Sequence, residues 1–198
     1  ADMHGLHSLG ASVIAVKSAI TVAPLVIAQI NGSMPRTFGD STVSDNFIDY
    51  AVEMKEPLHE EQQSIPSKQE VQIGENVADL VPDGATLQAG IGAIPDAVMK
   101  SLVGRRDLGI HTEMFSEGML DLIESGSVTN MKKDLDVGHA VATFAKGSRR
   151  LYDYLNDNPM VMMKSVDYTN DTSIIRKQKN MISINSAVAV DLTGQVCA

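Results

Sequence analysis

Two features that could do chemistry lie close together near the middle of this chain of 198 residues. Residues 90–92 read Gly-Ile-Gly, and because glycine has no Cβ, a ligand can approach the backbone closely at such a turn. Glu113 stands 21 residues after Gly92 (113 minus 92) and follows the short apolar segment 108–110 after His111 and Thr112. A carboxylate at this spacing could hold a ribose hydroxyl, or it could attack a bound ligand as a nucleophile.

The surrounding pattern predicts the elements that position these two features. Residues 86–89 alternate as a strand does, and Pro95 and Asp96 are typical of the first turn of a helix. Gly104 would end that helix, and residues 108–110 would form a second strand that delivers Glu113 to its end. Ligands of open α/β sheets bind outside the carboxyl ends of the strands. We therefore expect the glycine turn and the carboxylate side by side at that edge.

A dinucleotide site is one interpretation of this unit. Gly-x-Gly after a strand, with an acid about 20 residues further on, fits that motif. The third glycine does not fit, because position 95 is proline. A nucleotide-binding or regulatory module without covalent chemistry therefore remains an alternative hypothesis.

Longer strings resemble the acetyl-CoA hydrolase/transferase family, which includes the 4-hydroxybutyrate and butyrate CoA-transferases. Residues 90–98 read GIGAIPDAV and residues 108–118 read LGIHTEMFSEG, in the order and spacing of that family. The segments NGSMPRTFGDS (31–41), FAKGSRRLYDY (144–154) and INSAVAVDLTGQ (184–195) extend the resemblance over nearly the whole chain. Family members are more than twice as long, so the chain is expected to be an internal fragment.

The resemblance implies an α/β fold. It would be a three-layer sheet with helices on both faces, in two related tandem domains of which only part is present. Residues 1–56 would end the first domain, residues 57–66 have the composition of a linker, and residues 67–198 would begin the second domain. Strands and helices alternate along the chain, which is typical of a largely parallel sheet.

Several further elements are expected from the same pattern. A capping box of Ser67 and Glu70 predicts a helix start. The other predicted helices are 12–22, 119–124, 148–155 and 173–178, and the other predicted strands are 25–30, 48–53, 140–144, 161–163 and 182–190.

Glu113 is the nucleophile that the resemblance implies. Its carboxylate would attack an acyl-CoA, and CoA would then be held as a thioester on this side chain before a second acid takes it. The resemblance also implies that CoA binds at Gly90, Ile91, Gly92, Ala93 and Ile94, with Asn185 in the same pocket. The expected function is CoA transfer between a short-chain acyl-CoA and acetate, butyrate or 4-hydroxybutyrate. Acetyl-CoA hydrolysis on the same scaffold is the alternative.

Other polar residues are open to two interpretations each. His111 alternates with Glu113 and could support the site or simply be packed. Arg36 could meet a carboxylate or phosphate, and so could the basic residues Lys146, Arg149 and Arg150, unless these form a solvated turn. The remaining histidines show no metal-ligand spacing, and no metal is expected.

Composition narrows the classes of partner. A formal charge of −9 argues against nucleic acid, and a single cysteine suits a reducing, cytoplasmic compartment. Residues 11–30 are apolar enough to suggest a membrane span, but Lys17 and Pro24 favour a helix followed by a strand. The expected partners are small-molecule acyl-CoA and short carboxylic acids, with no membrane contact. The full-length protein is expected to be a homo-oligomer.

Overall fold

A parallel sheet forms the centre of the computed structural model, which describes residues 1–61 and 65–198. Two three-stranded sheets, β12-β6-β7 and β9-β11-β3, meet where His111 bridges Val141 and Thr112 N donates to Val141 O at 3.0 Å. The strands of this arrangement are β3 (Phe38–Gly39), β6 (Thr86–Ala89), β7 (Gly109–Ile110), β9 (Ala140–Ala142), β11 (Val161–Met163) and β12 (Met181–Ile184). Every pair among them that is hydrogen-bonded in a ladder is parallel.

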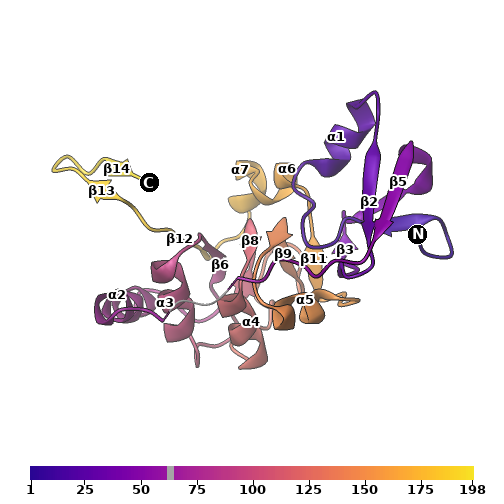
Figure 1. Ribbon diagram of the computed structural model, residues 1–198. Helices are drawn as coiled ribbons and strands as arrows, with labels where there is room; N and C mark the ends of the chain where they lie inside the picture. Colours follow the sequence, from indigo (N-terminus) through magenta and orange to yellow (C-terminus); the bar gives the residue numbers. More distant parts are fainter. Residues whose placement is uncertain (62–64) are drawn as a thin grey trace.

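Helices connect these strands in sequence order (Figure 1). They are α2 (Lys68–Ala78), α3 (Ala93–Ser101), α4 (Glu117–Glu124), α5 (Arg149–Leu155), α6 (Val166–Thr169) and α7 (Thr172–Ile175). Helices α3, α4 and α5 lead successively from β6 to β7, β9 and β11, whereas α6 and α7 lead back to β12 on the other side of β6. The strand order therefore reverses between β6 and β12. Such a switch point is where open α/β sheets bind ligands.

The hydrophobic core lies between the central strands and helices α2 to α5. Its fully buried members come from both strands and helices: Leu87, Ile110, Phe115, Met119, Leu120, Leu151 and Met163. Burial of such side chains contributes about 1.5–3 kcal/mol each. The core holds the strand ends that carry the site in fixed positions.

Local sequence signals explain where the helices begin. Ser67 and Glu70 form the predicted capping box at the start of α2, each side chain accepting from the other's backbone N–H. Helix α3 begins at Ala93, so Pro95 lies in its first turn, where a missing N–H leaves no helical bond unmade. The helix expected at 173–178 is present as the shorter α7, and α6 before it was not predicted.

The first 54 residues add two small sheets to this body. Their elements are β1 (Leu6–Ser8), α1 (Val16–Val22), β2 (Ile27–Asn31), β4 (Thr42–Ser44), the 3-10 helix η1 (Asp45–Phe47) and β5 (Tyr50–Met54). Strands β1 and β4 pair antiparallel, and β2 and β5 pair parallel. The predicted helix and strand on either side of Pro24 are therefore present. Val13 N donates to Thr143 O at 2.9 Å, and β3 joins β11, so this region is tied to the sheet.

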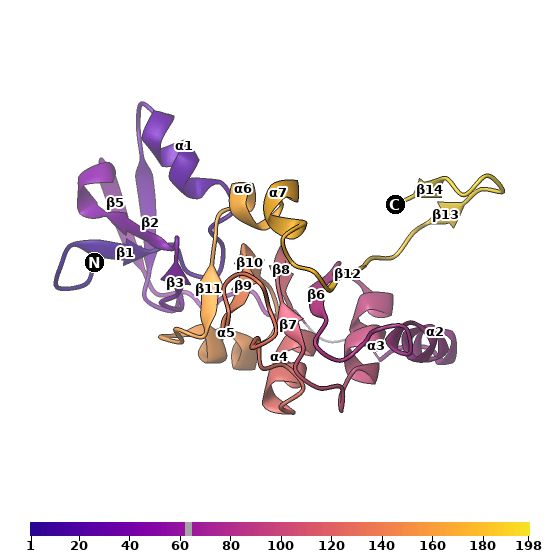
Figure 2. The same ribbon diagram turned by 180° about the vertical axis from the view of Figure 1, so that it is seen from behind.

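The last residues extend away from the body as an antiparallel hairpin (Figures 1 and 2). Its strands are β13 (Ala189–Val190) and β14 (Val196–Cys197). The prediction of one long strand over 182–190 was wrong, because β12 ends at Ile184 and the chain leaves the sheet there. Asn185 consequently follows a strand and does not lie within one.

The α/β class and the largely parallel pairing are confirmed. Most predicted elements are present within a few residues of their expected bounds. The described part of the segment 57–66 has no helix or strand, and residues 62–64 of that predicted linker lie outside the described residues.

Candidate functional site

Glu113 follows the end of β7, as the sequence predicted, and lies in the short break before the next strand. The strand resumes as β8 (Met114–Phe115), which pairs with β10 (Phe144–Ala145). Glu113 O accepts from two successive backbone donors, Thr143 N at 2.9 Å and Phe144 N at 3.1 Å. Two residues of the neighbouring segment thus oppose the single residue Glu113, so the β-bulge lies in the segment that pairs with Glu113. Glu113 is exposed, although Thr112 and Met114 on either side of it are buried.

A pocket of about 210 Å³ lies at this break, and we name it the Glu113 pocket. It is lined by Gln88, His111, Thr112, Glu113, Thr169, Asn170, Ile175, Met181 and Ser183. These residues come from β6, the end of β7, the α6–α7 connection and β12, so the pocket borders the switch point. Asn170 Nδ2 donates to Glu113 Oε2 at 3.4 Å, which orients the carboxylate.

The glycine turn, residues 90–92, directly follows β6. Gly92 has a φ of +120° and precedes α3, while a Cβ on Gly92 would meet nothing within 4 Å. Its glycine is therefore required by backbone conformation and not by a neighbour. Gly90 N donates to Ile184 O at 2.9 Å, which removes it from the expected set of free donors. The N–H groups of residues 91–94 have no acceptor within the described part of the chain.

A second pocket of about 230 Å³ opens beside these free N–H groups, and we name it the α3 pocket. Its lining includes Gly92, Ala93, Met114, Ser116 and Lys146. Met114 follows Glu113 directly, so the two pockets lie on either side of the same strand segment. Each is smaller than the roughly 300–1,000 Å³ of sites for drug-sized ligands.

Asn185 lies at the end of β12 and is bound to β6. Its Nδ2 donates to Gln88 Oε1 at 2.9 Å and to Ser183 Oγ at 3.0 Å. A Cβ on Gly90 would lie 2.5 Å from Asn185 Oδ1, so only glycine leaves room for this amide. The structure thus brings Gly90 and Asn185 together at the switch point, and Gln88 and Ser183 extend the network into the Glu113 pocket.

Comparison with known proteins identifies the family of this chain. The family model for the acetyl-CoA hydrolase/transferase N-terminal domain matches residues 1–60, and that for the C-terminal domain matches residues 147–198. The chain belongs to the acetyl-CoA hydrolase/transferase family. The resemblance of segments 90–98 and 108–118, which lie between the two matches, is covered by relatives that align with the whole chain.

A 4-hydroxybutyrate coenzyme A transferase of Clostridium kluyveri is 51% identical over 197 residues, covering 100% of this chain and 46% of that protein. The crystal structure of a 4-hydroxybutyrate CoA-transferase from Porphyromonas gingivalis has a TM-score of 0.93 and 40% identity, covering 98% of this chain and 50% of that one. RipA from Yersinia pestis has a TM-score of 0.95 and 42% identity, covering 99% of this chain and 46% of that one. The chain therefore spans about half the length of the relatives it matches.

The cations that the sequence offered as phosphate contacts are all paired with acids in this family member. Lys146 Nζ contacts Glu61 at 3.0 Å, and Arg149 Nε contacts Asp153 at 2.7 Å. Arg150 binds three carboxylates, those of Glu117, Asp121 and Glu124, and these hydrogen bonds raise its pKa. Of the three, only Lys146 lines the α3 pocket.

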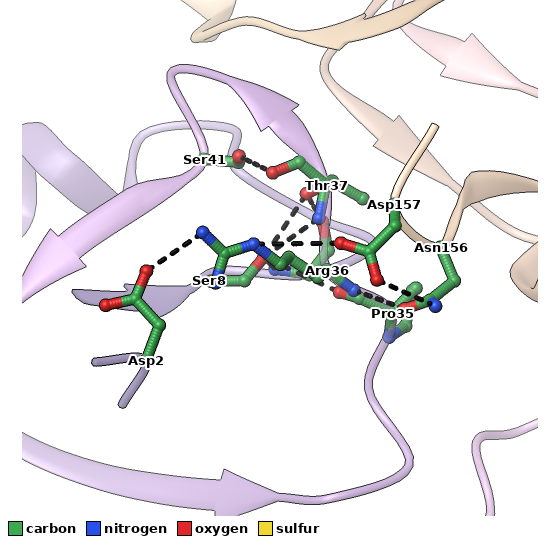
Figure 3. Close-up of polar contacts among 9 residues, drawn as sticks. Asp2, Ser8, Pro35, Arg36, Thr37, Ser41, Asn156 and Asp157 are labelled. Carbon is green, nitrogen blue, oxygen red and sulfur yellow. Dashed lines mark hydrogen bonds and ion pairs between the residues drawn. The ribbon is translucent and has the colours of Figure 1, made fainter. Parts of the chain in front are cut away.

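Arg36 is likewise occupied by carboxylates (Figure 3). Its guanidinium lies 2.9 Å from Asp2 and 3.7 Å from Asp157. Backbone donors at Leu6 and His4, together with Arg36, lower the pKa of Asp2 to about 2. The backbone of Arg36 also donates to Asn156 Oδ1 at 2.9 Å, so this loop fastens the first residues to the end of α5. The structure does not bring Arg36 to the Glu113 pocket.

A buried polar cluster below the site was missed by sequence reasoning. Lys133 is only 4% exposed and donates to Ile110 O at 2.8 Å and His139 O at 2.6 Å. Burial lowers the pKa of Lys133 to about 8, although Asp136 partly opposes this. Gly109 is the signal that could have revealed it, because a Cβ there would lie 2.5 Å from the Lys133 stem.

Asp136 links this cluster to the helix above the site. Lys164 Nζ and Tyr168 Oη each reach its carboxylate at 2.8 Å. Burial alone would raise the pKa of Asp136, but these hydrogen bonds hold it below its usual value. Tyr168 belongs to α6, which ends just before Asn170. The cluster therefore fixes the element that contacts Glu113.

Within residues 1–61 and 65–198, no three or more His, Cys, Asp or Glu side chains are grouped so that they could hold a metal ion. In the same ranges, no helix has the length and apolar character needed to cross a membrane.

Proposed function

We propose that this chain carries the nucleophile of a CoA-transferase. The enzyme would move CoA between a short-chain acyl-CoA and a carboxylic acid of the acetate, butyrate or 4-hydroxybutyrate type. The observation that carries this proposal is the exposure of Glu113, whose carboxylate lies between the buried residues Thr112 and Met114 in the break between β7 and β8. The names of the relatives support the reaction class.

Glu113 would act by forming two covalent intermediates in turn. Its carboxylate attacks the thioester carbonyl of the acyl-CoA, the C–S bond breaks, and CoA leaves as a thiolate from a mixed anhydride. The thiolate then attacks the glutamyl carbonyl, which releases the first acid as a carboxylate and leaves CoA on Glu113. The second acid repeats these steps in reverse and departs as the new acyl-CoA.

The free N–H groups of residues 91–94 are suited to the CoA side of this reaction. They lie at the start of α3, where the helix dipole favours negative charge, and they border the α3 pocket. Lys146 adds a cation to the same pocket. We therefore place CoA at Gly90, Ile91, Gly92, Ala93 and Ile94, with Gly90 supplying space for Asn185 and not a donor.

Asn170 extends the set of proposed site residues beyond those the sequence offered. Its amide contacts Glu113 Oε2 at 3.4 Å and lines the same pocket. An amide donor there can hold the carboxylate in one orientation before attack and can stabilise negative charge as it develops on oxygen.

Trapping the intermediate in the full-length protein tests the assignment. Borohydride added after incubation with an acyl-CoA should reduce the Glu113 thioester to an alcohol, which mass spectrometry of the peptide detects. Glu113→Ala should lower the transfer rate by at least about 1,000-fold, as removal of a nucleophile does. Glu75→Ala, an exposed glutamate on α2, is the matched control. Retention of most transferase activity by Glu113→Ala would sink the proposal.

Two other functions are separated by the same assay. Acetyl-CoA hydrolysis would release free CoA without a carboxylate acceptor. More distant relatives carry the name acetyl-CoA hydrolase, such as a Saccharomyces cerevisiae protein that is 30% identical over 128 residues. A nucleotide-binding module would bind NAD and form no adduct with acyl-CoA.

We also propose the domain boundaries, the cellular compartment and the oligomeric state. Residues 1–56 would end one domain and residues 67–198 would begin the next, with 57–66 as the linker. The protein would work in the cytoplasm without a metal, as a homo-oligomer when full length. Size-exclusion chromatography with light scattering would decide the oligomeric state.

A further inference from the structure

The loop of residues 130–136 contacts both parts of the chain that meet at the Glu113 carboxylate. On one side it holds the Ile110 peptide groups in β7. Ile110 N donates to Asn130 Oδ1 at 2.9 Å, and Lys133 Nζ donates to Ile110 O at 2.8 Å. Asn130 and Lys133 are both buried. The loop therefore fixes the backbone of the strand that leads to Glu113.

On its other side, the same loop holds α6 and the segment that follows α7. Asp136 accepts from Tyr168 Oη, in α6, and from Lys164 Nζ, each at 2.8 Å. Lys164 Nζ also lies 4.0 Å from the centroid of the Tyr168 ring, so the three side chains contact one another. Asp134 accepts from Lys179 N at 2.8 Å. A single loop thus bridges β7 and the α6–α7 region.

The backbone conformation of Asp136 shows that this bridge is held against strain. Its φ is +52°, in the left-handed region, which costs a non-glycine residue free energy and persists where the surrounding structure requires it. The side chain of Asp136 is only 15% exposed, so its carboxylate depends on its two protein donors. Strained residues of this kind cluster where a site must be held in one geometry.

Asn170 is the point at which the bridge reaches the reacting group. It directly follows α6, and its Nδ2 donates to Glu113 Oε2 at 3.4 Å. Thr169 before it is held from the direction of the strand, because its carbonyl oxygen lies 2.9 Å from His111 Nε2. A distance of 3.4 Å is long for a hydrogen bond, so a small shift of α6 would break this contact.

We propose that Asp136 and Tyr168 are positioning residues for the CoA transfer, because their hydrogen bond holds α6 where Asn170 orients the Glu113 carboxylate for attack. This inference rests on the proposed function. Neither side chain is among the described residues that line the Glu113 pocket, so both act through Asn170. Loss of their hydrogen bond should therefore lower kcat and leave the KM for the acid acceptor unchanged.

A double-mutant cycle in the full-length protein tests this route. The assay is transfer from acetyl-CoA to butyrate or 4-hydroxybutyrate, whichever the wild type uses faster. Tyr168→Phe removes only the hydroxyl and keeps the ring beside Lys164, so it should lower kcat by roughly 5-fold, the scale of one net hydrogen bond. Asn170→Ala should lower kcat by roughly 10-fold or more, because a donor to the reacting carboxylate is lost. The double variant should be no slower than Asn170→Ala alone.

Tyr152→Phe is the matched control. It also removes one tyrosine hydroxyl, which donates from α5 to His59 O at 3.0 Å. Its effect on kcat, whatever its size, should multiply with that of Asn170→Ala, because the two sites are independent. If far-UV circular dichroism shows that Tyr168→Phe does not fold, Asp136→Asn, which keeps one oxygen acceptor, takes its place in the same cycle.

The outcomes distinguish the two proposals. If the wild type transfers CoA to neither acid, the proposed function fails and this inference falls with it. If the wild type transfers CoA but either single variant keeps the wild-type kcat, or Tyr168→Phe raises KM instead, the function stands and the inference is overturned. Effects of Tyr168→Phe and Asn170→Ala that multiply also overturn it, because the hydrogen bond would then serve stability alone.

Discussion

Replacing Lys133 with methionine should change how the stability of the protein depends on pH. Lys133 carries a buried ammonium group that donates to two backbone carbonyls, those of Ile110 and His139. Lys133→Met keeps an unbranched apolar stem but removes the charge and both donors. Ile110 belongs to β7, the strand that leads to Glu113, so the perturbation lies directly beneath the proposed site.

The sign follows from the direction of the pKa shift. Burial lowers the pKa of Lys133 in the folded state to about 8, from the usual lysine value of 10.5. Between these values the unfolded chain binds more protons than the folded one, so stability rises with pH. At about 1.4 kcal/mol per pKa unit, the full rise is about 3 kcal/mol, most of it gained between pH 7 and pH 10. The neutral amine keeps two N–H groups, so both carbonyls remain paired.

The Lys133→Met substitution changes two contributions to stability, and these have opposite signs at pH 7. It leaves the carbonyls of Ile110 and His139 without these donors, which lowers stability by about 1–3 kcal/mol for each carbonyl. It also removes the penalty for a buried charge, which raises stability at pH 7 by about 3 kcal/mol. Wild type and variant should therefore differ modestly at pH 7. The gap in the free energy of unfolding should widen by about 2–3 kcal/mol by pH 10, because only the wild type gains from deprotonation.

Urea unfolding followed by far-UV circular dichroism measures this gap at pH 7, 8, 9 and 10 in the full-length protein. Lys132→Met is the matched control, since Lys132 is exposed and adjacent. Its gap from wild type should not widen with pH. A gap for Lys133→Met that stays constant across this range would refute the reasoning, because the buried ammonium would then carry no folding penalty.

Three further changes test other parts of the structure. Gly90→Ala would place a Cβ 2.5 Å from Asn185 Oδ1, so it should displace this amide and weaken CoA binding measured by calorimetry, and unchanged affinity would contradict this. Glu117→Gln should lower the free energy of unfolding by about 1–2 kcal/mol in urea titrations, because the buried carboxylate pairs with the half-exposed Arg150. An unchanged free energy of unfolding would show that this ion pair contributes nothing to stability. Ser67→Ala should cost about 1 kcal/mol through loss of the cap of α2, and a smaller helical signal should accompany the loss.

Local sequence signals predicted the elements that depend on neighbours in the chain. The capping box at Ser67 and the strand 161–163 are present as expected, since caps and apolar periodicity are local properties. The strand expected to continue from Ile184 to Val190 does not, because its partner β6, about 95 residues earlier in the chain (184 minus 89), ends at Ala89 opposite Ile184. No pattern within the segment 182–190 contains that partner.

The family motifs predicted which residues form the site, but not the contacts that position them. Glu113 does follow the end of β7, but the sequence did not reveal that its carbonyl oxygen accepts from both Thr143 N and Phe144 N. Asn170 was missed because it follows α6, a short helix that the sequence did not predict. Lys133 was missed because a lysine in a polar loop is normally exposed. All three depend on contacts between segments distant in the sequence.

The exposure of Glu113 is a property of the backbone and its supports more than of the residue itself. A carboxylate in a regular parallel strand, buried on both faces, would need a charged partner in the core. Glu113 is exposed in the break between β7 and β8, while His111 holds Thr169 and the Asp136 cluster holds Tyr168, so α6 presents Asn170 to the carboxylate. The reversal of strand order between β6 and β12 opens the same edge to a ligand. A nucleophile at this position therefore requires the whole arrangement, and a glutamate moved by one residue along the strand would face the core.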